Sequence, residues 1–256
     1  MQHELSQRRK ILVSRGLADL SRPQEFAVGK PNEQGDILEA ARSGNFARVK
    51  TILALRPSDV AMRGRYNLTP LHLAAENGHF NVVKLLLDYG AEIDAKGNIG
   101  QTPLLSAAEG GYAEVADILI AGGADITAET TSQRSILYAA AGGGLLKLVQ
   151  AIAAKGIDVN TPWYGSLKRT AIHQAAENGR ADVVRFLLAE GANVLSLTGY
   201  GWTPLSFAAI RGHREVIELL IHHGTPVDYR HDLGKPARRL GWTPFLLAAD
   251  GGHQDA

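Results

Sequence analysis

The chain has 256 residues, of which 27 are Lys or Arg and 26 are Asp or Glu, so its formal net charge is +1 and no global field favours nucleic acid. Cysteine is absent, which excludes disulfide scaffolds and zinc sites built on thiolates. No apolar run approaches the roughly 20 residues of a membrane-spanning helix, so we expect a cytoplasmic protein without a membrane partner, with the nucleus as the alternative location.

Residues 1–34 lie outside the pattern that organises the rest of the chain. The stretch LSQRRKILVSRGLADL predicts one short helix with basic residues on a largely polar surface, and the prolines and glycines that follow it indicate a linker. We interpret 1–34 as a basic N-terminal extension. A docking peptide, a solvated leader and the edge of an upstream domain are all open interpretations of it.

The clearest structural unit is TPLHLAAENGHFNVVKLLLDYGAEIDA, which begins at Thr69. Pro70 favours the first position of a helix, where its missing N–H costs nothing. Gly78 predicts the end of that helix, because a C-cap glycine tolerates the left-handed conformation. Apolar residues at helical spacing then predict a second helix, which ends at Gly90. Each unit is therefore expected to be a pair of short helices.

The unit recurs along the chain. Positions equivalent to Thr69 are Thr102, Ser135, Thr170, Thr203 and Thr243, at spacings of 33, 33, 35, 33 and 40 residues. A pair of alanines and a first-helix glycine recur with the same spacing. Two short helices cannot bury their apolar faces alone, so the copies must stack on one another.

A period of about 33 residues with the motif TPLH-x-A is the signature of ankyrin repeats, and residues 35–256 resemble such an array. The resemblance implies an all-α solenoid of stacked helix–turn–helix units with short β-hairpin fingers. It also implies that His72 and His173 make hydrogen bonds between repeats. The units are predicted near 35–63, 64–96, 97–129, 130–164, 165–197, 198–237 and, as a partial copy, 238–256.

Three copies depart from the pattern. The unit at 35–63 lacks TPLH, as expected of a terminal capping repeat. The copy at Ser135 carries Gly142 and Gly143 near the end of its first helix, where glycine costs roughly 1 kcal/mol relative to alanine, and small residues in its second helix; we expect it to be the least stable repeat. The last copy has no second helix within the sequence, so we expect some of the apolar surface of Phe245, Leu246 and Leu247 to stay open.

The residues that could carry chemistry do not form a recognisable catalytic or metal site. No phosphate-binding loop, dinucleotide fingerprint, nucleophile elbow or HExxH pair is present. His213 and the pair His222–His223 invite a metal interpretation, but no carboxylate or cysteine at ligand spacing completes a site. Acids such as Glu76, Glu109 and Glu177 lie in separate repeats, each just before the first-helix glycine, which predicts a ladder rather than a converging pair. We expect no enzyme activity, no metal and no cofactor.

The resemblance implies a scaffold for protein–protein recognition that uses the fingers and the first-helix face. The alternative is a regulatory segment of a larger signalling protein or enzyme, such as an NTPase receptor, an acyltransferase or a kinase. A nucleic-acid partner is disfavoured by the net charge of +1. The sequence specifies neither the partner's identity nor the oligomeric state.

We place the partner surface on the finger side of the C-terminal half, where aromatic and basic residues gather at positions that stacking does not need. Such residues most often anchor interfaces. Residues 229–242 hold four basic residues against one acid, which favours an acidic or phosphorylated partner segment. Trp202 and Trp242 keep a second interpretation as packing residues, because Trp before Thr-Pro is common in the family. The predicted partner-binding residues are Trp163, Tyr164, Lys168, Arg169, Tyr200, Trp202, Arg230, Arg238, Arg239 and Trp242.

Overall fold

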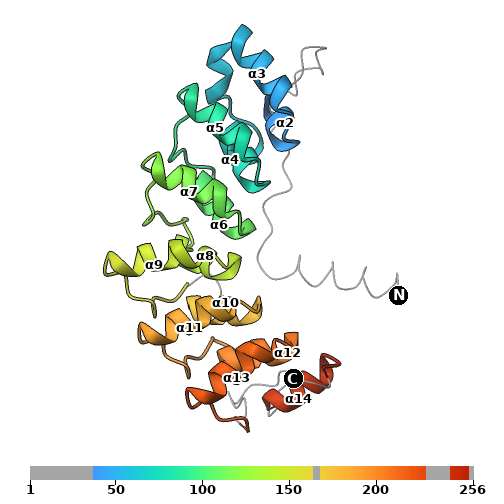
Figure 1. The fold of residues 1–256 in the computed structure, drawn as a ribbon, viewed down its shortest axis with the longest axis vertical. Coiled ribbons are helices and arrows are strands. Elements are labelled where there is room, and N and C mark those ends of the chain that lie inside the picture. Colours follow the sequence, from blue (N-terminus) through green and yellow to red (C-terminus); the bar gives the residue numbers. More distant parts are fainter. Residues whose placement is uncertain (1–36, 164–167, 229–242, 254–256) are drawn as a thin grey trace, which may run out of the picture. The chain divides into compact units, whose positions relative to one another are not determined.

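Each repeat consists of two short helices joined by a tight turn, and in this computed structural model the pairs follow one another in chain order (Figure 1). The structure describes residues 37–163, 168–228 and 243–253. The first helices of the pairs are α2 (Ile37–Arg42), α4 (Pro70–Glu76), α6 (Pro103–Gly110), α8 (Ile136–Gly143), α10 (Ala171–Glu177), α12 (Pro204–Arg211) and α14 (Pro244–Asp250). The second helices are α3 (Phe46–Leu55), α5 (Phe80–Asp88), α7 (Ala113–Ala121), α9 (Leu146–Ala154), α11 (Ala181–Ala189) and α13 (Arg214–His222).

The first helices begin where the Thr-Pro motif predicts. Thr69, Thr102 and Thr203 have extended backbone conformations, and each side chain accepts a hydrogen bond from an N–H in the first helical turn. A proline follows each of them at the start of the helix. These caps satisfy N–H groups that have no partner inside the helix, each worth roughly 1 kcal/mol. The recurring motif thus fixes where every unit starts.

Neighbouring repeats pack first helix on first helix and second helix on second helix. The buried apolar residues form one continuous cluster from Ile37 to Leu220, and a small second cluster of Ala209, Leu247 and Ala248 lies between α12 and α14. The alanine pairs of α2 to α12 sit in this interior with almost no exposed surface, because small side chains let neighbouring helices approach closely. In α14, Ala248 is buried and Ala249 is exposed. The predicted all-α solenoid is confirmed.

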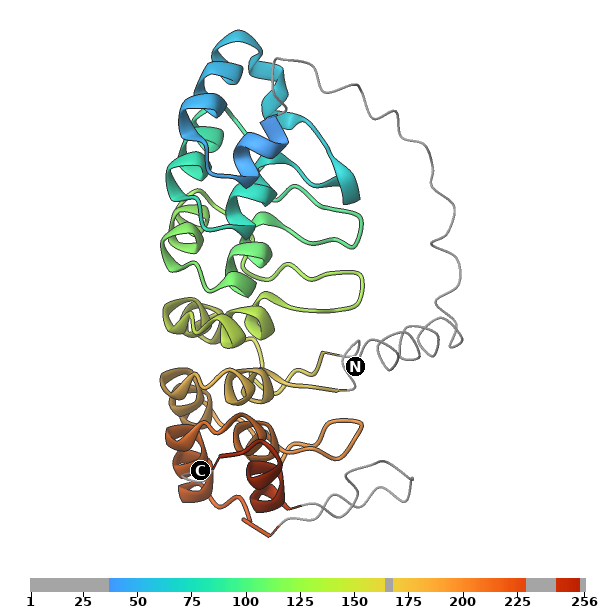
Figure 2. The ribbon, with the colours of Figure 1, turned by 90° about the vertical axis from the view of Figure 1, so that its right-hand side faces the viewer.

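The fingers that join consecutive repeats project from one side of the helix pairs (Figure 2). The fingers between α3 and α12 are closed by a backbone hydrogen bond, for example from the Gly97 N–H to the Gln101 carbonyl (3.0 Å) and from the Thr198 N–H to the Trp202 carbonyl (3.0 Å). Among the described residues, strand pairing is confined to two isolated bridges, Glu129 with Ser135 and Trp163 with Arg169. The fingers are therefore turns rather than a continuous sheet.

The two ends of the described array differ in how well their helices are covered. At the N-terminal end, α2 and α3 bury Ile37, Val49 and Leu53 completely. At the other end, Phe245 is 74% exposed and Leu246 is 45% exposed, whereas Leu247 is fully buried against the neighbouring repeat. The expectation of open apolar surface on this helix is met at Phe245 and Leu246 but not at Leu247, because Leu247 packs in one cluster with Ala209 of α12.

In the repeat at Ser135 the first helix packs closely on the preceding repeat, whereas the second helix packs loosely. Gly143 lies so close to the preceding repeat that a Cβ there would be 2.1 Å from the Ala108 carbonyl oxygen, so the glycine permits close packing of α8 on α6. Its second helix, α9, is packed less closely on α7 than the other neighbouring second helices are on each other. That residues 135–160 exchange their amide hydrogens faster than residues 69–94 stays a prediction.

No helix in the described part of the chain is long and apolar enough to cross a membrane. The predicted extension at 1–34 lies outside the described residues. The helices that the structure describes all belong to one unit, Ile37–Ala256.

Candidate functional site

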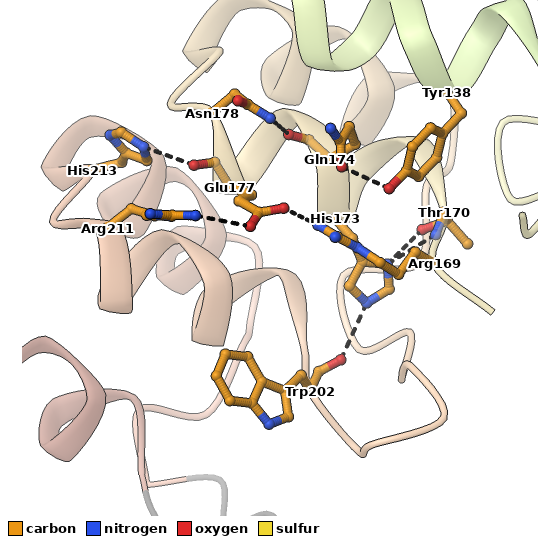
Figure 3. Close-up of polar contacts among 10 residues, drawn as sticks. All are labelled: Tyr138, Arg169, Thr170, His173, Gln174, Glu177, Asn178, Trp202, Arg211 and His213. Atoms are coloured by element: carbon orange, nitrogen blue, oxygen red, sulfur yellow. Dashed lines mark hydrogen bonds and ion pairs between the residues drawn. The ribbon is translucent and has the colours of Figure 1, made fainter. Parts of the chain in front are cut away.

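Buried histidines tie the first helices to the fingers of the next repeat, as the resemblance implies. The Thr170 N–H donates to Nδ1 of His173 (3.1 Å), so this nitrogen carries no proton and the proton of the neutral ring is on Nε2. Nε2 then donates to the carbonyl oxygen of Trp202 (3.2 Å), as Figure 3 shows, and to that of Ser196 (3.1 Å). His72 repeats the arrangement with the Gln101 carbonyl (3.0 Å).

Burial favours the neutral form of both rings. It is the main cause that lowers the pKa of His173 to about 4 and lowers the pKa of His72 in the same direction. Both side chains are completely buried. These histidines stabilise the stack and are closed to any ligand.

Two of the acids that recur on the first helices, Glu109 and Glu177, are paired with arginine rather than with one another. Glu109 contacts Arg134 at 2.8 Å, and burial raises the pKa of Glu109 in spite of that positive charge. Glu177 forms ion pairs with Arg169 and, at 3.3 Å, with Arg211. Burial acts to raise the pKa of Glu177, but the two guanidinium groups outweigh it and the pKa is lowered. This is the predicted ladder, with no convergence of carboxylates.

An open hollow of about 530 Å³ lies between the C-terminal ends of α10 and α12. Figure 3 shows its lining side chains together with the Glu177 ion pairs. Its lining combines amides, one carboxylate, one guanidinium and one imidazole, which can bind polar groups but place no nucleophile beside a base. The lining residues are Gln174, Glu177, Asn178, Arg211 and His213.

The histidines singled out for metal binding are engaged in other contacts. Nε2 of His213 lies 2.9 Å from the Glu177 carbonyl oxygen. Nδ1 of His223 lies 2.8 Å from the Leu219 carbonyl oxygen, and its ring contacts that of His222 edge-on. Within the described residues, no group of three His, Cys, Asp or Glu side chains could hold a metal ion.

Trp163, at the start of the lengthened finger, packs against the preceding repeat. Its backbone pairs with Arg169, and its ring contacts the Tyr138 ring edge-on at a centroid distance of 4.9 Å. The guanidinium of Arg134 lies 5.3 Å from the centre of the indole. The tryptophan is half-buried, so part of its ring faces solvent and part supports the finger.

Lys168 and Arg169 differ in accessibility although they are neighbours. Lys168 is exposed at the turn of the finger, with a φ of 63°. Arg169 turns inward: its side chain is 19% exposed, pairs with Glu177, and stacks over the Phe207 ring at 4.3 Å. Its guanidinium therefore joins α10 to α12. Of the two, Lys168 offers its charge to solvent.

The next finger brings Tyr200 and Trp202 together. Tyr200 is 66% exposed. Trp202 is half-buried, with its ring 5.1 Å from that of Phe207, and it packs against the small cluster under α14. Packing therefore accounts for much of Trp202, as the second interpretation held. Tyr164, Arg230, Arg238, Arg239 and Trp242 lie outside the described residues.

Sequence reasoning missed the Arg169–Glu177–Arg211 network and the hollow beside it. A signal was present, because Arg134 and Arg169 both stand directly before the helix-capping residue of their repeat. From that position an arginine reaches a first-helix acid. The sequence alone could not assign the pairing, since Arg134 contacts the acid of the preceding repeat and Arg169 that of its own.

Comparison with known proteins agrees with this architecture. A family model described as ankyrin repeats matches three times, at residues 37–130, 107–197 and 136–231. The crystal structure of the human ASB11 ankyrin repeat domain superposes with a TM-score of 0.65 at 27% sequence identity, over 87% of this chain and 100% of that one.

Two curated relatives share part of the array. Glycerophosphocholine phosphodiesterase GDE1 of Candida albicans is 33% identical over 87 residues, which are 34% of this chain and 7% of that protein. The human 2-5A-dependent ribonuclease is 38% identical over 80 residues, which are 31% of this chain and 10% of the ribonuclease. The matched part is thus a small share of each relative's length.

Proposed function

The chain belongs to the ankyrin-repeat family, and on that premise we propose that it is a non-catalytic scaffold that binds a protein partner through its fingers and first-helix face. Ankyrin repeats are general protein–protein interaction modules. The observation that carries the proposal is a difference in burial. The positions that recur from repeat to repeat are mostly buried in the stack, whereas Lys168, Tyr200 and Arg211 lie exposed on fingers and first-helix ends.

The partner we propose has an acidic or phosphorylated segment. Support comes from the sequence of residues 229–242, with four basic residues and one acid, and from the exposed Lys168 in the finger between α9 and α10. Opposite charges speed association and select partners more than they add affinity. We propose a cytoplasmic location, with the nucleus as the alternative, and no nucleic-acid partner.

Affinity purification with the intact chain, followed by identification and purification of the bound protein, tests the proposal. With that partner, Trp163→Ala and the double variant Arg238→Glu/Arg239→Glu are each expected to weaken binding by at least about 1 kcal/mol. Helical content measured by circular dichroism should stay unchanged, which separates lost contact from lost folding.

Substitution of the first-helix acids supplies the matched comparison. Glu76→Gln and Glu109→Gln lie on first helices of the N-terminal half and should leave affinity unchanged. Full affinity in the Trp163 and Arg238/Arg239 variants, together with loss in these two, would move the binding surface to the first helices of the N-terminal half.

A second candidate function is regulation within a larger enzyme or signalling protein. It is favoured by the two relatives above, a phosphodiesterase and a ribonuclease by name, in which the matched repeats make up 7% and 10% of the protein. Sequencing the full-length transcript separates the candidates, because an additional catalytic domain in the same reading frame supports the second.

A further inference from the structure

The finger between α11 and α12 differs from the other fingers in its charge. Residues 191–210 contain no Asp, Glu, Lys, Arg or His, whereas the corresponding loops that start at Gly90, Gly123 and Gly156 each contain charged residues. A finger without charge cannot select a partner by charge complementarity. What it offers to a partner must be apolar or neutral.

Three large apolar side chains stand exposed on this finger. Leu195 is 45% exposed, Leu197 is 40% exposed and Tyr200 is 66% exposed. At the positions of the two leucines, the finger that begins at Gly90 carries Asp94 and Lys96. Single exposed apolar residues are ordinary, but three within six residues concentrate exposed apolar surface on one finger, and concentrated apolar surface marks interaction sites.

Stacking does not account for the leucine at position 195. In two other repeats the equivalent side chain links neighbouring repeats: Asp94 accepts from the Asp125 N–H (3.0 Å), and Asn160 accepts from the Asn193 N–H (2.8 Å). After Leu195 the matching donor position is Pro226, which has no N–H. Residue 195 therefore does not make the hydrogen bond that its equivalents make between repeats. We infer that its apolar side chain serves another purpose.

The backbone of the finger is held in place before any partner arrives. His173 donates to the carbonyls of Ser196 and Trp202, and the Thr198 N–H donates to the Trp202 carbonyl (3.0 Å). The Trp202 N–H in turn donates to the Thr198 hydroxyl (3.1 Å). A pre-ordered loop loses little conformational entropy on binding, which makes its exposed side chains effective anchors.

We propose that Leu195, Leu197 and Tyr200 form an apolar contact that seats uncharged, apolar side chains of the protein partner. The inference rests on the proposed scaffold function. It adds a second contact, independent of charge, to the one proposed for the basic residues of 229–242. Tyrosine is the strongest anchor of the three, because it combines a large buried area with a polar hydroxyl at the interface.

The test uses the partner purified with the intact chain and a triple variant, Leu195→Gln/Leu197→Gln/Tyr200→Ser. All three side chains are exposed, so the variant is expected to keep the melting temperature of the parent chain. The dissociation constant is expected to rise at least about tenfold. That ratio should be the same at about 50 and 500 mM salt, because screening weakens charge contacts and leaves apolar ones intact.

Ile99→Gln is the matched control, since Ile99 is 48% exposed at the position of Tyr200 in the finger before α6. It should leave the dissociation constant unchanged. A partner that binds the triple variant as tightly as the parent, or a loss that disappears at high salt, overturns the apolar contact while the scaffold function stands. Capture of no protein overturns both. Binding of neutral phosphatidylcholine vesicles that the triple variant abolishes would replace the protein partner with a lipid surface.

Discussion

Replacing Gly143 with alanine is expected to lower the free energy of unfolding by about 1–3 kcal/mol, the usual cost of overpacking a close-packed contact. A Cβ at this position would lie 2.1 Å from the Ala108 carbonyl oxygen and 2.9 Å from the Gly111 Cα, both backbone atoms of the preceding repeat. Backbone atoms cannot rotate away, so α6 and α8 must separate. Urea unfolding followed by circular dichroism measures the change.

Gly142→Ala is the matched control for this prediction. Its Cβ would meet the side chain of Gln174 at 2.7 Å, and a flexible side chain can move aside. Alanine also favours the helix by roughly 1 kcal/mol over glycine, so this variant is expected to be as stable as the parent or more so. Equal destabilisation by the two substitutions would show that the close contact of Gly143 with α6 has no special role.

The stability of the array is expected to fall by about 3 kcal/mol as the pH is lowered from 6.5 to 4, through His173 alone. The folded state holds the pKa of this histidine at about 4, below its ordinary value of 6.5, chiefly because the ring is buried. As the pH falls, the unfolded chain therefore binds the proton before the folded chain does. The stabilisation that comes from the neutral His173 is fully present only above pH 6.5. Protonation would also set an Nδ1 proton against the Thr170 N–H. His72 acts in the same direction.

The variant His173→Ser isolates this contribution. Ser206 occupies the equivalent position in the next repeat, where its hydroxyl accepts from the Thr203 N–H (3.2 Å), so serine can complete the cap. The variant is expected to be less stable at pH 7, because the carbonyls of Ser196 and Trp202 lose their donor. Its stability should then depend less on pH between 6.5 and 4. The role of His173 would be contradicted if the free energy of unfolding fell equally for parent and variant between pH 6.5 and 4.

The fold could be predicted from the sequence because the repeats carry their own signals for the start and the end of each first helix. Thr-Pro begins a helix and glycine ends it for local reasons, and the period shows that the units must stack. The role of Gly143 could not be predicted, since its value comes from a contact with Ala108 and Gly111 of another repeat. In isolation it looked like a destabilising residue inside a helix.

The candidate site was less accessible to sequence reasoning. Composition favoured the aromatic and basic residues of the C-terminal fingers, but it could not show that Arg169 turns inward to Glu177 and Phe207 while Lys168 faces solvent. The apolar finger was overlooked because leucines inside a repeat look like core residues. Only their exposure distinguishes Leu195 and Leu197 from the buried leucines of the helices.

Hydrogen exchange of the chain with and without its purified partner tests the central proposal most directly, that the C-terminal fingers bind a protein. Partner binding is expected to slow amide exchange in residues 163–169 and 195–202, and to leave the second helices α5 and α7 unchanged. Protection confined to α5, α7 or the fingers of the N-terminal half would contradict the proposal.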